Sequence, residues 1–91
     1  NAVRMIDLNS GIVSTLVNDI EGPSCISFHQ KYLIVSEFNN KNIVMIDLET
    51  KKKIHLLPKG IISNPTGVAI HPTNRFLYFV DAGEHCIKVI K

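Results

Sequence analysis

Two stretches decide the fold: PTGVAIHPTNRFLYFVDAGEHCIKVI from Pro65 to Ile90, and PSCISFHQKYLIVSEFNNKNIVMI from Pro23 to Ile46. Each begins with a proline and a short apolar strand that ends in a histidine. A polar turn then leads to a second apolar strand that closes on an acid, and a polar loop leads to a third strand. The histidines are His29 and His71, and the acids are Glu37 and Asp81. The chain is therefore predicted to be an array of structural repeats.

The N-terminal hairpin extends the same array. Val3–Leu8 reads VRMIDL, and a turn at Asn9–Gly11 separates it from the β-branched run Ile12–Val17. Further along the chain, NIVMIDLETKKKIHLL from Asn42 to Leu57 repeats the arrangement without a gap, and both copies share the core IDL. A shared core with matching residues in register on both sides indicates a second copy of one unit.

The expected elements are all short β-strands, because no window of the sequence shows helical spacing of its apolar residues. First strands are expected at Cys25–Phe28 and Gly67–Ile70, second strands at Tyr32–Glu37 and Phe76–Asp81, and third strands at Asn42–Leu48 and Cys86–Ile90. Four short strands in a period of about 40 to 44 residues are typical of a β-propeller blade. The predicted fold class is all-β, with four-stranded antiparallel meanders as propeller blades.

The segment GVAIHPTNRFLYFVDAGEHCIKVI resembles the NHL repeat, whose pattern runs from a GVAV-type strand through LYVAD to a polar loop and an I-x-V strand. Its Leu77–Asp81 stretch, LYFVD, is also similar to the YWTD repeats. Both resemblances imply a six-bladed propeller. The second repeat departs from the signature at Ser36–Asn40, and Gly67 has Ser24 and Cys25 in its place. The resemblance is specific for the fold and says little about function.

On this mapping, residues 1–17 form the outer two strands of one blade, residues 23–57 a complete blade, and residues 65–91 the first three strands of the next. A six-bladed ring needs roughly 250 residues at this period. The chain is therefore expected to be a partial propeller of about two blades that requires the remaining blades of a larger parent. Three copies closing a ring are the alternative, but the joined ends would then duplicate a third strand.

The composition excludes several classes of protein. Charged residues make up 20% of the chain and the formal net charge is +2, so neither nucleic acid nor an anionic membrane is expected as the partner. The longest apolar runs are too short for a membrane span. Cys25 and Cys86 lie in apolar runs of different repeats, which predicts buried free thiols rather than a disulfide. Nothing in the sequence assigns a compartment.

Four residues are the candidates for metal binding, although no cofactor is expected. His29 and His71 hold equivalent positions after the first strands and could converge near the channel, but a zinc site needs a third protein ligand. Glu37 and Asp81 offer oxygen ligands for a hard cation, as the resemblance to lactonase-like propellers implies. For the two acids we favour a structural role, in which they accept hydrogen bonds from backbone N–H groups of the loop that follows each.

The preferred function is a non-enzymatic protein-interaction scaffold, because no catalytic constellation is visible and loops on a rigid frame are the usual carriers of recognition. Aromatic pairs such as Phe28 with Tyr32 are interpreted as packing between blades. The basic tip Lys51–Lys53 is interpreted as a solvated turn. Two alternatives stay open: a metal-dependent propeller enzyme of the lactonase or amidating-lyase kind, and a YWTD-like extracellular ligand-binding module. The candidate interaction residues are Asn39, Asn40, Lys41, Lys59, Glu84 and His85.

Overall fold

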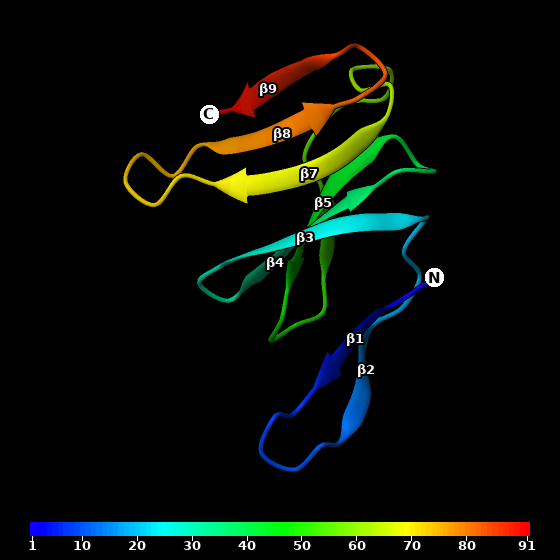
Figure 1. Ribbon diagram of the computed structural model, residues 1–91, viewed down its shortest axis with the longest axis vertical. Helices are drawn as coiled ribbons and strands as arrows, with labels where there is room; N and C mark the ends of the chain where they lie inside the picture. The colour runs from blue at the N-terminus through cyan, green and yellow to red at the C-terminus, as the bar shows by residue number, and fades with distance from the viewer.

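The computed structural model describes residues 1–91 and contains nine β-strands and no helix. The strands are β1 (Val3–Ile6), β2 (Val13–Val17), β3 (Pro23–His29), β4 (Tyr32–Glu37), β5 (Asn42–Asp47), β6 (Lys53–His55), β7 (Pro65–Ile70), β8 (Leu77–Asp81) and β9 (Cys86–Ile90). They form three meandering antiparallel sheets, β1-β2, β3-β4-β5-β6 and β7-β8-β9, called here the first, second and third sheets (Figure 1). The prediction of an all-β chain with antiparallel sheets is confirmed.

The same kind of turn closes the β1–β2 hairpin of the first sheet and the β5–β6 hairpin of the second sheet. Asp7 accepts hydrogen bonds through Oδ1 from the N–H groups of Asn9 (2.8 Å) and Ser10 (3.2 Å). In the second sheet, Asp47 Oδ1 accepts from the residues two and three positions further on, at 2.9 and 3.2 Å. An aspartate that bonds its own following backbone stabilises a tight turn. The aspartate of the repeated IDL core thus fixes the hairpin in both copies.

Two apolar layers join the three sheets, and β4 contributes to both. Along a strand, successive side chains point to opposite faces. Leu33 and Val35 therefore pack toward the first sheet, with Val3, Ile20, Val44 and Ile46. Ile34 packs toward the third sheet, with Ile43, Ile62, Leu77 and Phe79. The second sheet therefore packs against another sheet on both of its faces, whereas the first and third sheets each do so on one face only.

Each of the three sheets is thus one layer in a series. In Figure 1 the third sheet lies at the top, the second in the middle and the first at the bottom, and β7 lies beside β3. The structure contains no helix that is long and apolar enough to span a membrane. The strands of each sheet run across the series, so their connecting turns gather along two opposite edges of the molecule.

Two expectations about burial are wrong. Both cysteines are free as predicted, but Cys25 is only half-buried and Cys86 is exposed. In the second sheet, Asn42 holds the position that Cys86 has in the third sheet. Asn42 is buried, and its side-chain amide donates to the carbonyl of Leu57, just after the fourth strand β6. The third sheet has no fourth strand, so nothing covers Cys86.

Phe28 is the second case. Its side chain is 59% exposed, although a packing role between blades was expected. Phe28 lies on the same face of the second sheet as Leu33, its cross-strand partner, and that face is turned toward the first sheet. The first sheet has only two strands, so it does not reach far enough to cover Phe28.

Candidate functional site

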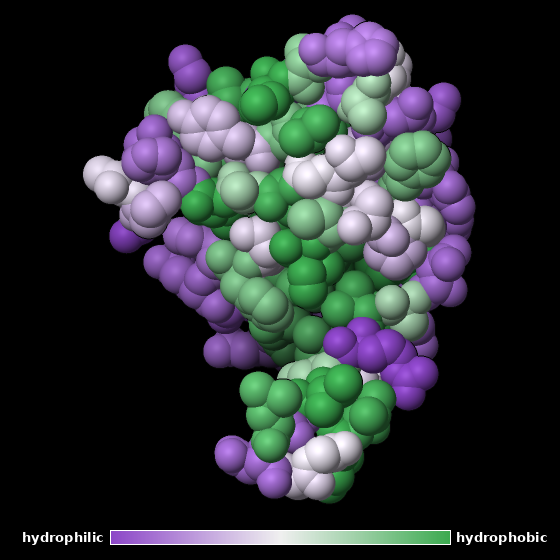
Figure 2. All heavy atoms as spheres, in the orientation of Figure 1, coloured by the Kyte–Doolittle hydropathy of each residue, from purple (hydrophilic) through white to green (hydrophobic).

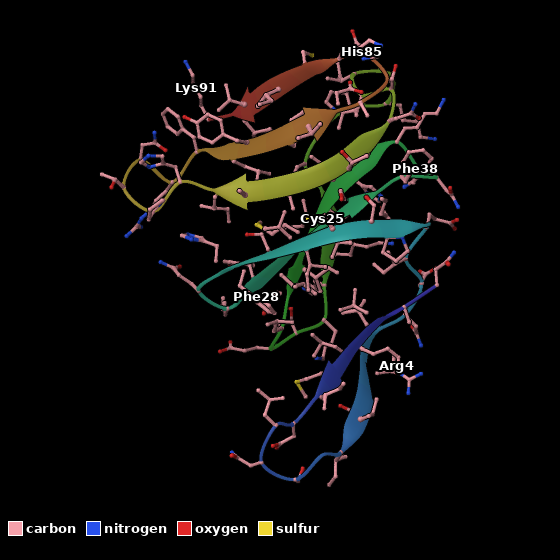
Figure 3. The ribbon with its side chains drawn as sticks, in the orientation of Figure 1. Arg4, Cys25, Phe28, Phe38, His85 and Lys91 are labelled. Atoms are coloured by element: carbon pink, nitrogen blue, oxygen red, sulfur yellow. The ribbon has the colours of Figure 1, made fainter.

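One edge of the molecule gathers four connecting segments, and we call it the turn edge. It consists of the β4–β5 turn (residues 38–41), the β8–β9 turn (residues 82–85), and the loops at residues 18–22 and 56–64 that lead from one sheet to the next. Phe38 and His85 both lie on this edge, at the right of Figure 3, whereas Phe28 lies on the opposite edge. Five of the six interaction residues expected from the sequence lie in its two turns, and Lys59 lies in the longer loop. All six are exposed.

The two turns have the same backbone geometry. Lys41 and His85 end them, and each adopts a left-handed conformation with φ of 53°. The first residue of each turn donates its N–H to the carbonyl just before the proline of its own repeat: Phe38 to Gly22 at 2.8 Å, and Ala82 to Asn64 at 2.9 Å. Non-glycine residues rarely adopt a positive φ, and such residues persist where surrounding bonds enforce them. The turn edge is therefore a fixed backbone frame.

Glu37 ties the first of these turns to the loop before its repeat. The side chain is fully buried, and its Oε2 accepts a hydrogen bond from the backbone N–H of Glu21 at 2.8 Å. The other oxygen, Oε1, accepts from the side-chain amide of Asn40 at 3.2 Å. The Lys53 ammonium lies 4.0 Å from Oε2, and His55 Nε2 lies 3.8 Å from Oε1. Glu37 thus holds the loop, the turn and the outer strand together.

Asp81 does the same in the third sheet. It is fully buried and accepts hydrogen bonds from the backbone N–H groups of Ser63 at 3.1 Å and Asn64 at 2.9 Å. The Lys88 ammonium donates to Asp81 at 3.2 Å and to Glu84 at 2.6 Å. Burial by itself raises the pKa of the Asp81 carboxyl, but these backbone N–H groups and the Lys88 charge outweigh it and hold the pKa below its usual range.

These contacts correct part of the prediction for the two acids. Both do accept backbone N–H groups, but the donors belong to the loops that precede each repeat, at residues 18–22 and 56–64. The expected donors in the following loops are absent, and Asn40 contributes its side chain instead. The acid can reach back because the loop and the end of the second strand meet at the same edge. Every buried side-chain polar atom in the structure has a hydrogen-bond partner.

The lysines that accompany the two acids come from different strands. Lys53 extends from the fourth strand β6 and donates to the carbonyl of Asp19 at 2.9 Å. Lys88 extends from the third strand β9 and donates to the carbonyl of Ile61 at 3.1 Å. Each ammonium therefore joins a buried carboxylate to a carbonyl of the preceding loop. The repeat in the sequence gives no signal of this arrangement, because the two lysines are not at matching positions.

The two histidine candidates lie on the edge opposite the turn edge. His71 Nδ1 accepts hydrogen bonds from the backbone N–H groups of Thr73 at 3.1 Å and Asn74 at 3.3 Å. Asp7 and Asp47 make the same pair of bonds in the other hairpin turns. His71 therefore acts as a turn residue. His29 is half-buried at the end of β3.

The four metal candidates do not form one cluster. His29 and His71 lie on one edge of the sheets, and Glu37 and Asp81 on the other, each acid in its own network. Nowhere in the chain do three or more His, Cys, Asp or Glu side chains come together as a set that could hold a metal ion.

Phe38 is the residue of this edge that the sequence interpretation left out. Phe38 is 41% exposed, and in the sequence it stands between the buried Glu37 and the exposed Asn39 and Asn40. The corresponding residue in the third sheet is Ala82, so the aromatic side chain is not a requirement of the repeat. The signal was available in the sequence as a departure from the repeat at this position.

Comparisons with known proteins leave the chain without an assigned family. No protein-family model matches the sequence, and a search of curated proteins finds no significant match.

Proposed function

We propose that this chain is a section of an NHL-type β-propeller that serves as a protein-interaction scaffold, with the turn edge as its recognition surface. The blade interpretation is supported by the meandering strand order and by the matching hydrogen bonds of Glu37 and Asp81 in two successive repeats. It is also supported by the series of sheets, since blades bury their apolar faces against their neighbours.

Both ends of this series are open, which favours a parent propeller with further blades. On the first side, Ile26 and Phe28 of β3 are 44% and 59% exposed. A hollow of about 470 Å³ lies beside Ile26, between the N-terminal end of β1 and the start of β3. On the last side, Val80 and Ile87 are 38% and 71% exposed. Figure 2 shows apolar residues through the middle of the molecule and at its lower end, and a mixture of apolar and polar residues near its upper end.

The exposure of Phe38 carries the proposed recognition role. Its backbone is fixed on both sides, because its N–H bonds Gly22 and its carbonyl accepts from Lys41 at 3.3 Å. An exposed aromatic ring on a rigid turn loses little conformational entropy on binding, and such residues are frequent hot spots of protein interfaces. The amides of Asn39 and Asn40 beside it supply hydrogen-bonding groups for a polar rim.

The test compares two phenylalanines on opposite edges. The wild-type chain, Phe38→Ala and Phe28→Ala are used as baits for partner capture, followed by affinity measurement with each partner identified. A partner of the turn edge should bind wild type and Phe28→Ala equally, and bind Phe38→Ala about tenfold more weakly or worse. Equal losses in both variants would contradict this surface assignment. Substrate turnover that a metal chelator abolishes would contradict the scaffold role.

A further inference from the structure

The third sheet has one free face, formed by the side chains of Ala69, Tyr78, Val80, Ile87 and Val89. Val80 is 38% exposed, Ile87 71% and Val89 42%. A shallow hollow of about 310 Å³ lies on this face, beside Gly67 and Val80, and its lining is almost wholly apolar. An apolar surface of this kind on a rigid sheet marks an interaction site.

The corresponding face of the second sheet shows what such a surface binds. Ile34, Ile43 and Met45 hold the positions of Tyr78, Ile87 and Val89 in the repeat. There the third sheet covers them, and Ile34 and Ile43 are 3% and 0% exposed.

The first sheet uses its own matching residue, Val3, in the same way against the second sheet. One interface therefore occurs twice in the same direction along the chain, and the free face is the place where it would occur a third time.

We propose that the free face of the third sheet is the docking surface for a further antiparallel β-sheet of the same repeat type. This inference rests on the repeat that underlies the proposed function, and it adds which surface is used and which chemistry the incoming sheet must bring. The incoming sheet occupies the place that the third sheet takes on the second. Its first strand lies over β7 and β8, as β7 lies against β3 and β4.

The chemistry of the free face differs from that of the preceding interface at the position of Ser36. Between the second and third sheets, the Ser36 hydroxyl donates to the carbonyl of Thr66 at 2.9 Å and lies 2.8 Å from the Ser24 hydroxyl. On the free face, Val80 stands in the place of Ser36. A valine cannot bond a carbonyl, so a strand that approached as β7 does would leave that group unpaired.

Gly67 is a second position at which the free face differs from the preceding interface. It holds the place of Cys25, and the absence of a side chain there opens the hollow beside Val80. A β-carbon at Gly67 would lie 3.7 Å from Val80, which is ordinary contact distance, so the hollow is room for a side chain from outside. The incoming strand therefore brings an apolar side chain over Gly67 and Val80, where the preceding interface has serine hydroxyls.

The test extends the chain in register. Lys91 corresponds to Asp47, so adding a second copy of residues 48–91 after Lys91 supplies a fourth strand next to β9 and then another three-stranded sheet. Val80→Asp is made in the 91-residue chain and in the extended chain, and urea unfolding is measured for each. Ile26→Asp is the matched control, because Ile26 is similarly exposed, at 44%, on the open surface at the other end.

A docked sheet would bury the new carboxylate, so Val80→Asp should lower the folded-to-unfolded ratio of the extended chain at least about tenfold more than that of the short chain. Ile26→Asp should cost the same in both chains. Since the added first strand is a copy of β7, Val80→Ser should stabilise the extended chain by restoring the serine bond, and should not stabilise the short chain.

Equal costs of Val80→Asp in the two chains would overturn the proposal. Sedimentation of the 91-residue chain as a dimer that Val80→Asp dissociates would also overturn it, because the face would then bind a second copy. Neither result depends on Phe38, so a failure here is distinguishable from a failure of the turn edge as the recognition surface.

Discussion

Replacing Asp81 by asparagine should cause a large loss of stability. The buried carboxylate accepts two backbone N–H groups and the Lys88 ammonium. An asparagine has only one acceptor oxygen, so a donor faces another donor and Lys88 loses its buried counter-charge. Hydrogen bonds to charged groups contribute about 1.5–3 kcal/mol each. Lys88 is partly exposed and keeps its bond to Glu84, so the loss comes from the bonds to the buried carboxylate. We expect Asp81→Asn to lower the free energy of unfolding by about 3–5 kcal/mol, which corresponds to roughly two such bonds.

The assay is urea unfolding followed by far-ultraviolet circular dichroism, since the chain has no tryptophan. The pH dependence follows from the lowered pKa of Asp81 in the folded protein. A carboxyl with a lowered folded-state pKa gives its full stabilisation above the unfolded pKa, about 3.9 for aspartate, and loses it as the pH falls toward the folded value. The difference between wild type and Asp81→Asn should therefore be constant near neutral pH and shrink below about pH 4.

Glu84→Gln is the matched control, because Glu84 bonds the same ammonium at 2.6 Å but is exposed at the surface. An exposed ion pair contributes about 0–1 kcal/mol, so this variant should lose little. Similar losses in Asp81→Asn and Glu84→Gln would refute the reasoning, since burial and the backbone bonds would then have no measurable weight.

The remaining predictions concern the turns. His71→Asp should keep the thermal midpoint of the wild type, because Asp7 and Asp47 make the same kind of turn. His71→Ala should lower the free energy of unfolding by about 1 kcal/mol. A thermal midpoint lowered equally by both variants would exclude the turn role of His71. Gly83→Ala should destabilise by about 1–3 kcal/mol in urea unfolding, because its β-carbon would lie 2.5 Å from that of Ser63. An unchanged urea midpoint for Gly83→Ala would contradict this prediction, because the loop that carries Ser63 would then have moved aside without cost.

Much of the fold could be predicted because its signals are local. Alternating apolar residues placed the strands to within about two residues at each end, and polar turns marked the hairpins. The repeated IDL core placed Asp7 and Asp47 at the same position of two equivalent turns. Cross-strand register then follows from the turns, so the grouping of strands into antiparallel sheets was within reach of the sequence.

The candidate site was predicted less well. The exposed loop residues were identified from their position between strands, but Phe38 was not, because a single aromatic in a turn has no periodic signal. The donors to Glu37 and Asp81 were assigned to the wrong loops, since their partners lie 16 to 18 residues earlier in the chain. Separations of this size are fixed by how the sheets stack and cannot be read from local pattern.

The sequence by itself determined the all-β class, the strands and the repeat, because these depend on side-chain alternation and on turn residues within a few positions. Only the tertiary structure decided which faces are covered and which charges are buried. Phe28 and Cys86 show the difference, because each lies in an apolar strand and yet is exposed. The first sheet is too short to cover Phe28, and the third sheet has no fourth strand to cover Cys86. Burial is a property of what packs against a residue, and the stacking of sheets decides it.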